Sequence, residues 1–272
     1  MLTDTHCHIN LMIKKKFDVN LTKHEVDSAK TIIQDAHQEN VKTLVTIGTS
    51  LVESSNCIKL AQHYPSVFAV VGIHPNDARS RWHEEFEKIR LLTQEKKTNK
   101  IVGIGETGLD FYWPNYNKQR QLDLFKAHIE LSLENDLALV VHMRNAQEEV
   151  LHALEPYKKE ITRGIMHCFS GDQSYADDII SLGFALGIGG IITYPKNTVL
   201  RSVVKSIPSN KIVLETDAPY LPPQIIRGKP NHPKYIKTIA DYIANLREEP
   251  LDILAQQTTK NAHTIFGIHE IG

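Results

Sequence analysis

The chain has 272 residues, of which 41% are hydrophobic and 23% are charged, as is typical of a soluble globular protein. Its formal net charge of −1 excludes a uniformly basic surface, so any contact with nucleic acid must come from a local basic patch or from bound cations. Three cysteines, an odd number, argue against a disulfide framework and favour the cytoplasm. We expect no signal peptide, because Asp4 comes almost at once, and no membrane span, because there is no run of about 18 apolar residues.

Eight short apolar segments, many of them rich in β-branched residues, alternate with segments of helical periodicity. They predict strands at Leu2–His6, Thr43–Gly48, Phe68–Ile73, Ile101–Glu106, Ala138–His142, Gly164–His167, Phe184–Ile188 and Ile212–Asp217. Most of them lack an alternation of polar and apolar residues, as expected of parallel strands that are buried on both faces. The intervening segments carry apolar stripes such as Val26, Ala29 and Ile33, and two further helices are expected at Lys234–Leu246 and Leu251–Phe266.

The eightfold alternation of strand and helix has no linker and no change of composition within it. It favours an α/β fold, a closed (β/α)₈ TIM barrel with an extra C-terminal helix, as a single domain over residues 1–272. An open, doubly wound sheet is the alternative, because counting strands does not distinguish the two. The loop Ala218–Pro233, rich in proline, glycine and basic residues, would lie over the mouth of a barrel.

Five of the predicted strands end on a residue that can bind a metal ion. His6 and His8 are two residues apart, so their side chains point the same way from an extended backbone. The other candidate ligands are Glu106, His142, His167 and Asp217. The C-terminal ends of barrel strands open onto one face, so all six side chains would meet there.

Four imidazoles and two carboxylates suit a pair of divalent cations, with Glu106 as the natural bridge between them. Mixed nitrogen and oxygen ligands fit Zn²⁺, Mn²⁺, Fe²⁺ or Ni²⁺, whereas Mg²⁺ normally prefers oxygen alone. The predicted cofactor is therefore two divalent metal ions, with Zn, Mg, Mn, Fe and Ni all left open.

Five motifs make this pattern specific. They are Thr-His-Cys-His at 5–8, Gly-Ile-His-Pro at 72–75, Gly-Glu-Thr-Gly-Leu-Asp at 105–110, His-Cys-Phe-Ser-Gly at 167–171 and Leu-Glu-Thr-Asp-Ala-Pro-Tyr-Leu at 214–221. Together they span nearly the whole chain, and they resemble the TatD family. The resemblance implies a barrel of the amidohydrolase type, metal-dependent hydrolysis, and cleavage of DNA from the 3′ end as in several members. It also implies metal ligands at His6, His8, Glu106, His142, His167 and Asp217.

One loop departs from the family pattern. Members often have Arg-Gly-Lys-Arg-Asn-Glu-Pro after the last strand, whereas this chain has Arg-Gly-Lys-Pro-Asn-His-Pro at 227–233. Pro230 thus removes a cation and His232 replaces a carboxylate. The first-strand pair His6 and His8, which some members lack, is present and favours two metals over one.

The predicted mechanism is hydrolysis by a water that the metals acidify. Asp217 and Glu106 are the predicted catalytic residues, with Asp217 both binding a metal and accepting the proton of the water. His74, at the end of the third strand, is predicted to contact the substrate phosphate or the leaving group. Arg144, two residues beyond His142, should point into the mouth and bind a phosphate.

Arg227 and Lys229 are further candidates for phosphate contacts, and Phe111-Tyr112-Trp113 could stack on bases or form a hydrophobic lid. The predicted partner is DNA or another phosphodiester or ester substrate, with no membrane and no obligate protein partner. Two other functions stay open: hydrolysis of another ester or amide, such as D-aminoacyl-tRNA deacylation, and a binding protein that keeps metal for stability alone.

Overall fold

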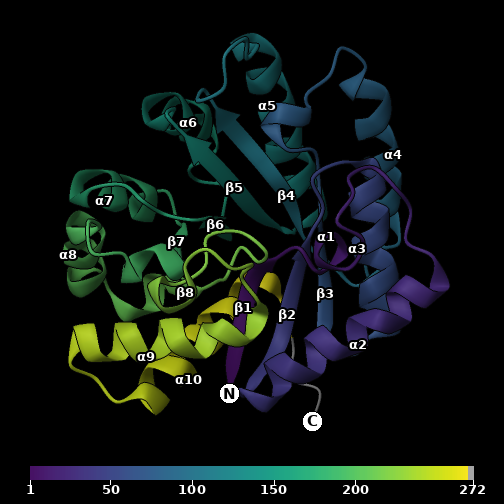
Figure 1. Ribbon diagram of the computed structural model, residues 1–272. Coiled ribbons are helices and arrows are strands. Elements are labelled where there is room, and N and C mark those ends of the chain that lie inside the picture. The colour runs from purple at the N-terminus through teal and green to yellow at the C-terminus, as the bar shows by residue number, and fades with distance from the viewer. Residues whose placement is uncertain (269–272) are drawn as a thin grey trace.

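The computed structural model describes residues 1–268, in which eight strands alternate with helices (Figure 1). The strands are β1 (Leu2–Cys7), β2 (Val41–Ile47), β3 (Val67–Val71), β4 (Ile101–Asp110), β5 (Ala138–Arg144), β6 (Gly164–Met166), β7 (Ala185–Ile188) and β8 (Ile212–Leu214). The α-helices are α1 (Ile9–Lys14), α2 (Lys23–Gln38), α3 (Leu51–His63), α4 (Trp82–Gln94), α5 (Lys118–Asn135), α6 (Gln147–Leu154), α7 (Gln173–Ser181), α8 (Thr198–Ser206), α9 (Ile236–Arg247) and α10 (Leu251–Phe266).

The sheet closes into a barrel. Its strands are parallel and follow each other in sequence order from β1 to β8. The first and last strands then meet: the backbone N–H of Asp217 donates to the carbonyl of His6 at 2.8 Å, and that of His8 donates to the carbonyl of Ala218 at 2.7 Å. A doubly wound sheet would instead reverse its strand order and keep two free edges. The predicted TIM barrel is therefore confirmed, and the open sheet is excluded.

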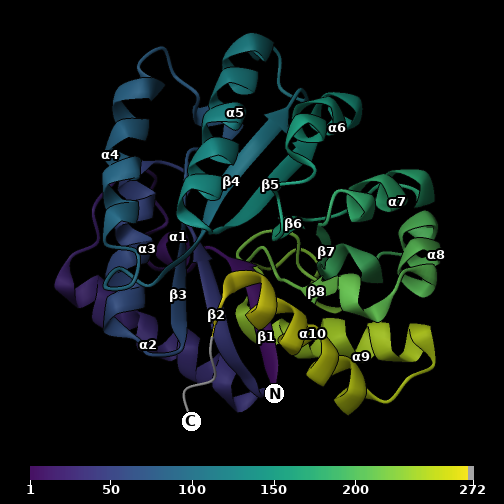
Figure 2. The ribbon, with the colours of Figure 1, turned by 180° about the vertical axis from the view of Figure 1, so that it is seen from behind.

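The barrel interior changes from apolar to polar along β5. Ala138, Val140 and His142 are two residues apart in β5, so all three point inward. The first two belong to a buried apolar cluster, which Ala262 and Phe266 of α10 complete from below. The hydroxyl of Thr259 in α10 donates to the carbonyl of Met1 at 3.1 Å, which places this helix at the N-terminal end of the strands. Figure 2 shows α10 crossing in front of β1 and β2.

Four α-helices of the described residues, α2, α3, α5 and α7, begin where a side chain accepts a hydrogen bond from a free backbone N–H. The Thr22 side chain accepts a hydrogen bond from the backbone N–H of Glu25 at the start of α2. The Glu25 carboxylate accepts one from the backbone N–H of Thr22, which completes a capping box. Ser50 and Asn117 cap α3 and α5 in the simpler way. The apolar stripe predicted in α2 is buried against the barrel. No α-helix of the described residues is both long and apolar enough to cross a membrane.

Seven of the eight strands end at a residue other than the predicted one, and β1, β2 and β3 differ by only one or two residues. The strands β4 and β5 continue to Asp110 and Arg144, because the two strands stay paired over this length. The strands β6 and β8 end earlier, at Met166 and Leu214. The backbone of Asp217 has already turned to a φ of 55°, which no strand accommodates. Some of the candidate ligands therefore lie on the loops that directly follow the strands.

The attachment of α10 to the barrel can be tested at Asn261, whose side-chain amide donates to the carbonyls of Ser209 and Ile212, both at 2.8 Å. We expect Asn261→Ala to lower the free energy of unfolding by about 1–3 kcal/mol, because buried carbonyls lose their donor. Lys260→Ala, at the exposed neighbouring position, should change it by less than about 0.5 kcal/mol. Urea denaturation of both variants checks this, and equal midpoints would show that α10 is held by apolar contacts alone.

Candidate metal centre

All six predicted metal ligands meet at the C-terminal end of the barrel strands. His6, Glu106 and His142 lie on β1, β4 and β5. His8, His167 and Asp217 follow the ends of β1, β6 and β8 within three residues. A cavity of about 230 Å³, here called the metal-site cavity, opens beside them. Its walls include His8, His74, Glu106, His142, His167 and Asp217, together with Asp77 and Tyr220.

Glu106 stands between two groups of imidazoles. Its Oε2 atom lies 3.3 Å from Nε2 of His6 and 3.9 Å from Nε2 of His8. Its Oε1 atom lies 2.8 Å from Nδ1 of His142 and 3.8 Å from Nε2 of His167. The carboxylate therefore presents one oxygen to each group.

Asp217 lies near three of the same imidazoles. Its Oδ1 atom lies 3.3 Å from Nε2 of His8 and 3.6 Å from Nε2 of His6. The same oxygen is 3.9 Å from Nε2 of His167. Donor atoms of this kind, gathered from strands that are far apart in the sequence, make a site that is able to bind metal.

Both carboxylates are ionised despite their burial. Burial alone would raise the pKa of Glu106, but the charge of His167, the hydrogen bond with His142 and the nearby ring of His6 bring it well below its usual value. For Asp217, burial is likewise opposed by His8 and by the neighbouring imidazoles, and its pKa is lowered. The mouth of the barrel thus holds two anionic oxygen ligands at neutral pH.

The pKa values of the histidines at the site are shifted in opposite directions. Burial would lower the pKa of His167, but the carboxylates of Glu215 and Glu106 raise it to about 10. For His6, burial and the neighbouring His167 lower the pKa. Burial and the nearby His142 lower the pKa of His74 to about 3, so this ring is neutral. Without a metal, a proton on His167 therefore compensates part of the negative charge.

The donor set fits divalent cations. Both ring nitrogens of His6 are buried, and none of the described residues forms a hydrogen bond with them. The Nδ1 atom of His8 lies 3.1 Å from the carbonyl of Ile47, which only accepts, so Nδ1 carries the hydrogen. In the neutral ring, Nε2 then directs its lone pair at Glu106 and Asp217. Unpaired imidazole nitrogens aimed at ionised carboxylates are what a cation would satisfy.

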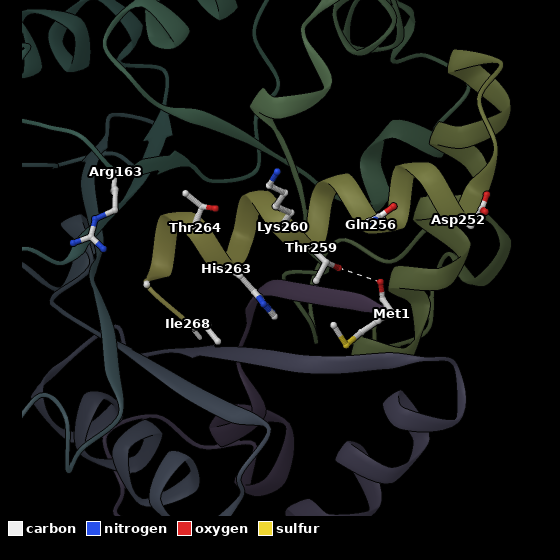
Figure 3. Close-up of a pocket in the computed structure, with 10 residues that line it drawn as sticks. Met1, Arg163, Asp252, Gln256, Thr259, Lys260, His263, Thr264 and Ile268 are labelled. Atoms are coloured by element: carbon white, nitrogen blue, oxygen red, sulfur yellow. Dashed lines mark hydrogen bonds between the residues drawn. The ribbon is translucent and has the colours of Figure 1, made fainter. Parts of the chain in front are cut away.

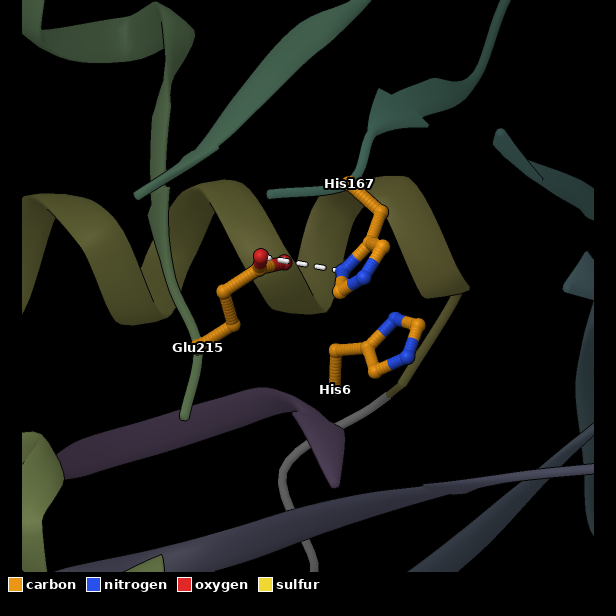
Figure 4. A group of neighbouring side chains, drawn as sticks. All are labelled: His6, His167 and Glu215. Carbon is orange, nitrogen blue, oxygen red and sulfur yellow. Dashed lines mark ion pairs between the residues drawn. The ribbon is translucent and has the colours of Figure 1, made fainter. Parts of the chain in front are cut away.

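Sequence reasoning missed two acidic residues behind the imidazoles. Oε1 of Glu215 lies 3.0 Å from Nδ1 of His167 (Figure 4), whereas Nε2 is the ring nitrogen near Glu106. Oδ2 of Asp110 lies 3.2 Å from Nε2 of His142. A carboxylate on the far nitrogen fixes the orientation of a histidine ligand and increases its basicity.

A signal for both residues was present in the sequence. Asp110 is four residues beyond Glu106 and Glu215 is two before Asp217, spacings that put each pair on one face of an extended chain. Asp4, two residues before His6, is a third such case. It accepts hydrogen bonds from the backbone and hydroxyl of Thr216 at 3.0 and 2.6 Å, which holds the segment in front of Asp217.

The four predicted substrate contacts are placed differently. His74 lines the metal-site cavity, with its Nε2 atom 3.7 Å from Oε1 of Glu106. Arg144 lies outside the lining, with its guanidinium carbon 3.5 Å from the centre of the Tyr112 ring. Arg227 stacks over Tyr194 at 4.6 Å, and Lys229 is exposed on the same loop. Only His74 is thus brought beside the candidate ligands.

A larger cavity, of about 800 Å³, lies at the opposite end of the barrel (Figure 3). It is bounded by Met1, by Arg163 and by the lower face of α10, including Thr259 and Lys260. None of the six candidate ligands lines it. Because the groups of neighbouring histidine, glutamate and aspartate side chains that could hold a metal lie at the other end, the metal-site cavity is the candidate functional site.

Comparison with known proteins agrees with this geometry. The family model for the TatD related DNases matches residues 3–267. A metal-dependent hydrolase of Bacillus subtilis strain 168, YabD, is 34% identical over 269 residues, which cover 99% of this chain and 100% of that protein. The 3′-5′ ssDNA/RNA exonuclease TatD of Escherichia fergusonii is 34% identical over 258 residues, covering 92% and 97%.

A solved structure supports the same assignment. The crystal structure of YJJV, a TatD homolog from Escherichia coli K12, matches with a TM-score of 0.88 and 28% identity over 98% of each chain. The likeness thus extends over the whole barrel and includes the mouth at which the candidate ligands meet. The chain therefore belongs to the TatD family and is a metal-dependent hydrolase.

Proposed function

We propose that the protein is a deoxyribonuclease that hydrolyses DNA phosphodiester bonds from the 3′ end, at a centre of two divalent cations. The observation that carries this proposal is the position of Glu106, with one oxygen toward His6 and His8 and the other toward His142 and His167. Two-metal sites commonly serve the hydrolysis of phosphodiesters. The exonuclease name of the relative from Escherichia fergusonii supports this choice of substrate.

The proposed ligands are His6, His8, Glu106, His142, His167 and Asp217. Divalent cations held by them would polarise a phosphoryl oxygen and make a water more acidic. The residues of the chain have their own parts in the reaction. Asp217, whose side chain keeps 13% of its surface exposed at the cavity, accepts the proton of the attacking water at a carboxylate oxygen. The neutral ring of His74 contacts the reacting phosphate or the leaving group.

The basic residues that could bind the phosphates of a DNA strand lie outside the metal-site cavity. Arg144, Arg227 and Lys229 could reach a bound strand only outside the metal-site cavity. Their proposed role is therefore to hold the phosphates that flank the scissile bond. Three cysteines without disulfides agree with the cytoplasm as the proposed compartment.

The proposed activity can be tested with Asp217→Asn. Removal of the proton acceptor and of one anionic ligand should lower kcat/KM on single-stranded DNA by at least roughly 100-fold. The measurement is nucleotide release from a 3′-labelled and a 5′-labelled oligonucleotide by metal-loaded protein. Asp252→Asn, an exposed aspartate on α10, is the matched control and should keep full activity.

Three results would contradict the proposal in different ways. Intact DNA with wild-type protein, together with amino acid released from a D-aminoacyl-tRNA, would assign the site to ester hydrolysis of another class. Nucleotide release that persists unchanged in Asp217→Asn would show that the activity comes from elsewhere. No hydrolysis across a panel of phosphodiesters, phosphomonoesters and esters would leave the metal as a structural ion in a binding protein.

The support of His167 by Glu215 can be tested through metal affinity. Glu215→Gln keeps the shape of the side chain but removes the charge behind the imidazole. We expect a loss of roughly 10–100-fold in metal affinity, measured by competition with a chelator. Glu248→Gln, at an exposed position, should leave the affinity unchanged. Equal affinities of the wild type and both variants would mean that Glu215 only orders the loop at Cys168. Its carboxylate also accepts a hydrogen bond from the backbone N–H of Cys168.

The raised pKa of His167 predicts how the stability of the metal-free protein depends on pH. The pKa is about 10 in the folded protein against an ordinary 6.5, so between these values the folded state keeps a proton that the unfolded chain loses. Stability from this group is complete below pH 6.5 and decreases as the pH rises, by at most about 1.4 kcal/mol per pH unit. Urea denaturation from pH 7 to 9 should show the decrease, and His167→Gln should remove it.

Metal binding should show the opposite dependence on pH. A histidine ligand must be neutral, so the cation displaces the proton of His167 and its affinity increases with pH. Calorimetry in buffers of different ionisation enthalpy measures the protons released. An affinity that is constant from pH 6 to 8, with no protons released, would contradict a role for His167 as a ligand.

A further inference from the structure

A second cavity, here called the side cavity, lies beside the metal-site cavity and has a volume of about 470 Å³. It is formed by the turn after β3 and by the loop between β4 and α5. Its lining residues are Pro75, Asn76, Ala78, Arg79, Trp113, Pro114, Asn115, Tyr116, Asn117, Arg120 and Gln121. None of the six candidate metal ligands is among them.

The two cavities share one wall. In the segment 74–79, His74 and Asp77 line the metal-site cavity, whereas the other four residues line the side cavity. The amide of Asn76 donates to Oδ2 of Asp110 at 2.9 Å, and the same oxygen lies 3.2 Å from His142. A small molecule bound in the side cavity would thus be separated from His142 only by the hydrogen-bonded side chains of Asn76 and Asp110.

The sizes of the cavities suit different parts of one substrate. Pockets that enclose small organic molecules usually measure about 300–1,000 Å³. At about 230 Å³ the metal-site cavity is below this range, so it suits cations and the reacting phosphodiester group rather than a whole nucleotide. The side cavity, at about 470 Å³, falls within the range.

The lining combines flat aromatic rings with a guanidinium group. Trp113 and Tyr116 are 52% and 43% exposed, unusually open for such large apolar side chains, and Tyr116 stacks on Phe111 at 4.6 Å. Arg120 donates from one nitrogen to the carbonyl of Ala78, which orients its side chain. Within residues 1–268 it pairs with no carboxylate, whereas Arg79 pairs with Asp18 at 2.9 Å. An aromatic ligand with negative charge would complement such a surface.

We propose that the side cavity binds the nucleotide adjoining the phosphodiester that is held at the metal centre. The base stacks on Trp113 and Tyr116, and its phosphate pairs with Arg120. Because a base in a duplex is paired and stacked on its neighbours, the cavity accepts an unpaired one. This assignment rests on the proposed hydrolysis of phosphodiesters and adds to it the place where the substrate is recognised.

Binding can be followed without catalysis through tryptophan fluorescence. The chain has two tryptophans, and Trp82 is buried at 6% exposure while Trp113 stands at the side cavity. Titration of metal-loaded protein with thymidine 5′-monophosphate should quench the emission of Trp113. The dissociation constant should rise about tenfold in Arg120→Gln and in Tyr116→Ala, since base stacking and a charged contact each contribute at least that much. Lys126→Gln, on the same helix as Arg120 but outside the cavity, should change nothing.

Kinetics separate this proposal from the proposed function. The two substrates are a short oligothymidylate and bis(p-nitrophenyl) phosphate, which has neither a nucleobase nor a second phosphate. In Arg120→Gln and Tyr116→Ala the ratio of kcat/KM for the oligonucleotide to that for the small diester should fall about tenfold. The same ratio should be unchanged in Lys126→Gln.

Each outcome decides one of the two proposals. If wild-type protein cleaves neither substrate, the proposed function fails, and the quenching of Trp113 still decides whether a nucleotide binds. If both are cleaved and the ratio does not move in either variant, the side cavity is not a subsite. If an acidic peptide quenches Trp113 as strongly as the nucleotide does, the cavity is a peptide site and our assignment is wrong. Tyr116 is exposed, so its replacement provides a folded variant even where Arg120→Gln is unstable.

Discussion

The constraint on which this structure depends is the burial of charge at the mouth of the barrel. Glu106 is nearly inaccessible to water, and an isolated buried carboxylate would be too costly to keep ionised. It stays ionised because the proton on His167 and the neighbouring rings of His142 and His6 compensate its charge. Removal of one partner from such a group leaves an uncompensated charge, so its members depend on each other. A cation in their midst would provide the compensation that a proton provides here.

The barrel makes this arrangement possible because it holds each donor on a separate rigid strand. The strand β1 carries Asp4 and His6, with His8 just beyond it, whereas the residues that the other strands give to the interior cluster are valine, isoleucine or alanine. Asp4 then fastens the segment before Asp217 by two hydrogen bonds from Thr216. The first strand thus supplies candidate ligands and also supports a candidate ligand that follows the last strand. The contacts that close the barrel therefore also position residues of the candidate site.

Much of the fold followed from the sequence because parallel buried strands leave a clear pattern. Eight apolar segments, a closed barrel and the terminal helices were all predicted, and the C-terminal helix was predicted to the residue. Strand ends were less certain. Whether β5 stops at His142 or continues to Arg144 depends on pairing with β4, which is a property of the neighbouring strand. The left-handed backbone at Asp217 is set by tertiary contacts and has no local signal.

For the site, the ligand-type residues were predictable because polar residues stood where apolar strands ended. The supporting residues Asp110 and Glu215 lie four and two positions from a candidate ligand in the sequence. They were not predicted, because acidic residues are usually exposed. Their burial became evident only with the fold. For Arg144 the sequence predicted a position that its side chain does not take. Its spacing from His142 predicted a place in the mouth, but its planar guanidinium lies on the ring of Tyr112, a contact that spacing does not reveal.

The division between strands and loops also explains how one barrel can combine a fixed reaction with a selectable substrate. The candidate ligands come from strand ends, which the whole barrel holds in place. The walls of the side cavity come from the loops after β3 and β4 and from the first turn of α5, and the loops can change more freely than the strand ends. In the segment 74–79, His74 lines the metal-site cavity and Arg79 lines the side cavity. Under the proposed function, a change in this segment would therefore act on substrate choice and on rate together, whereas a change at Tyr116 would act on substrate choice alone.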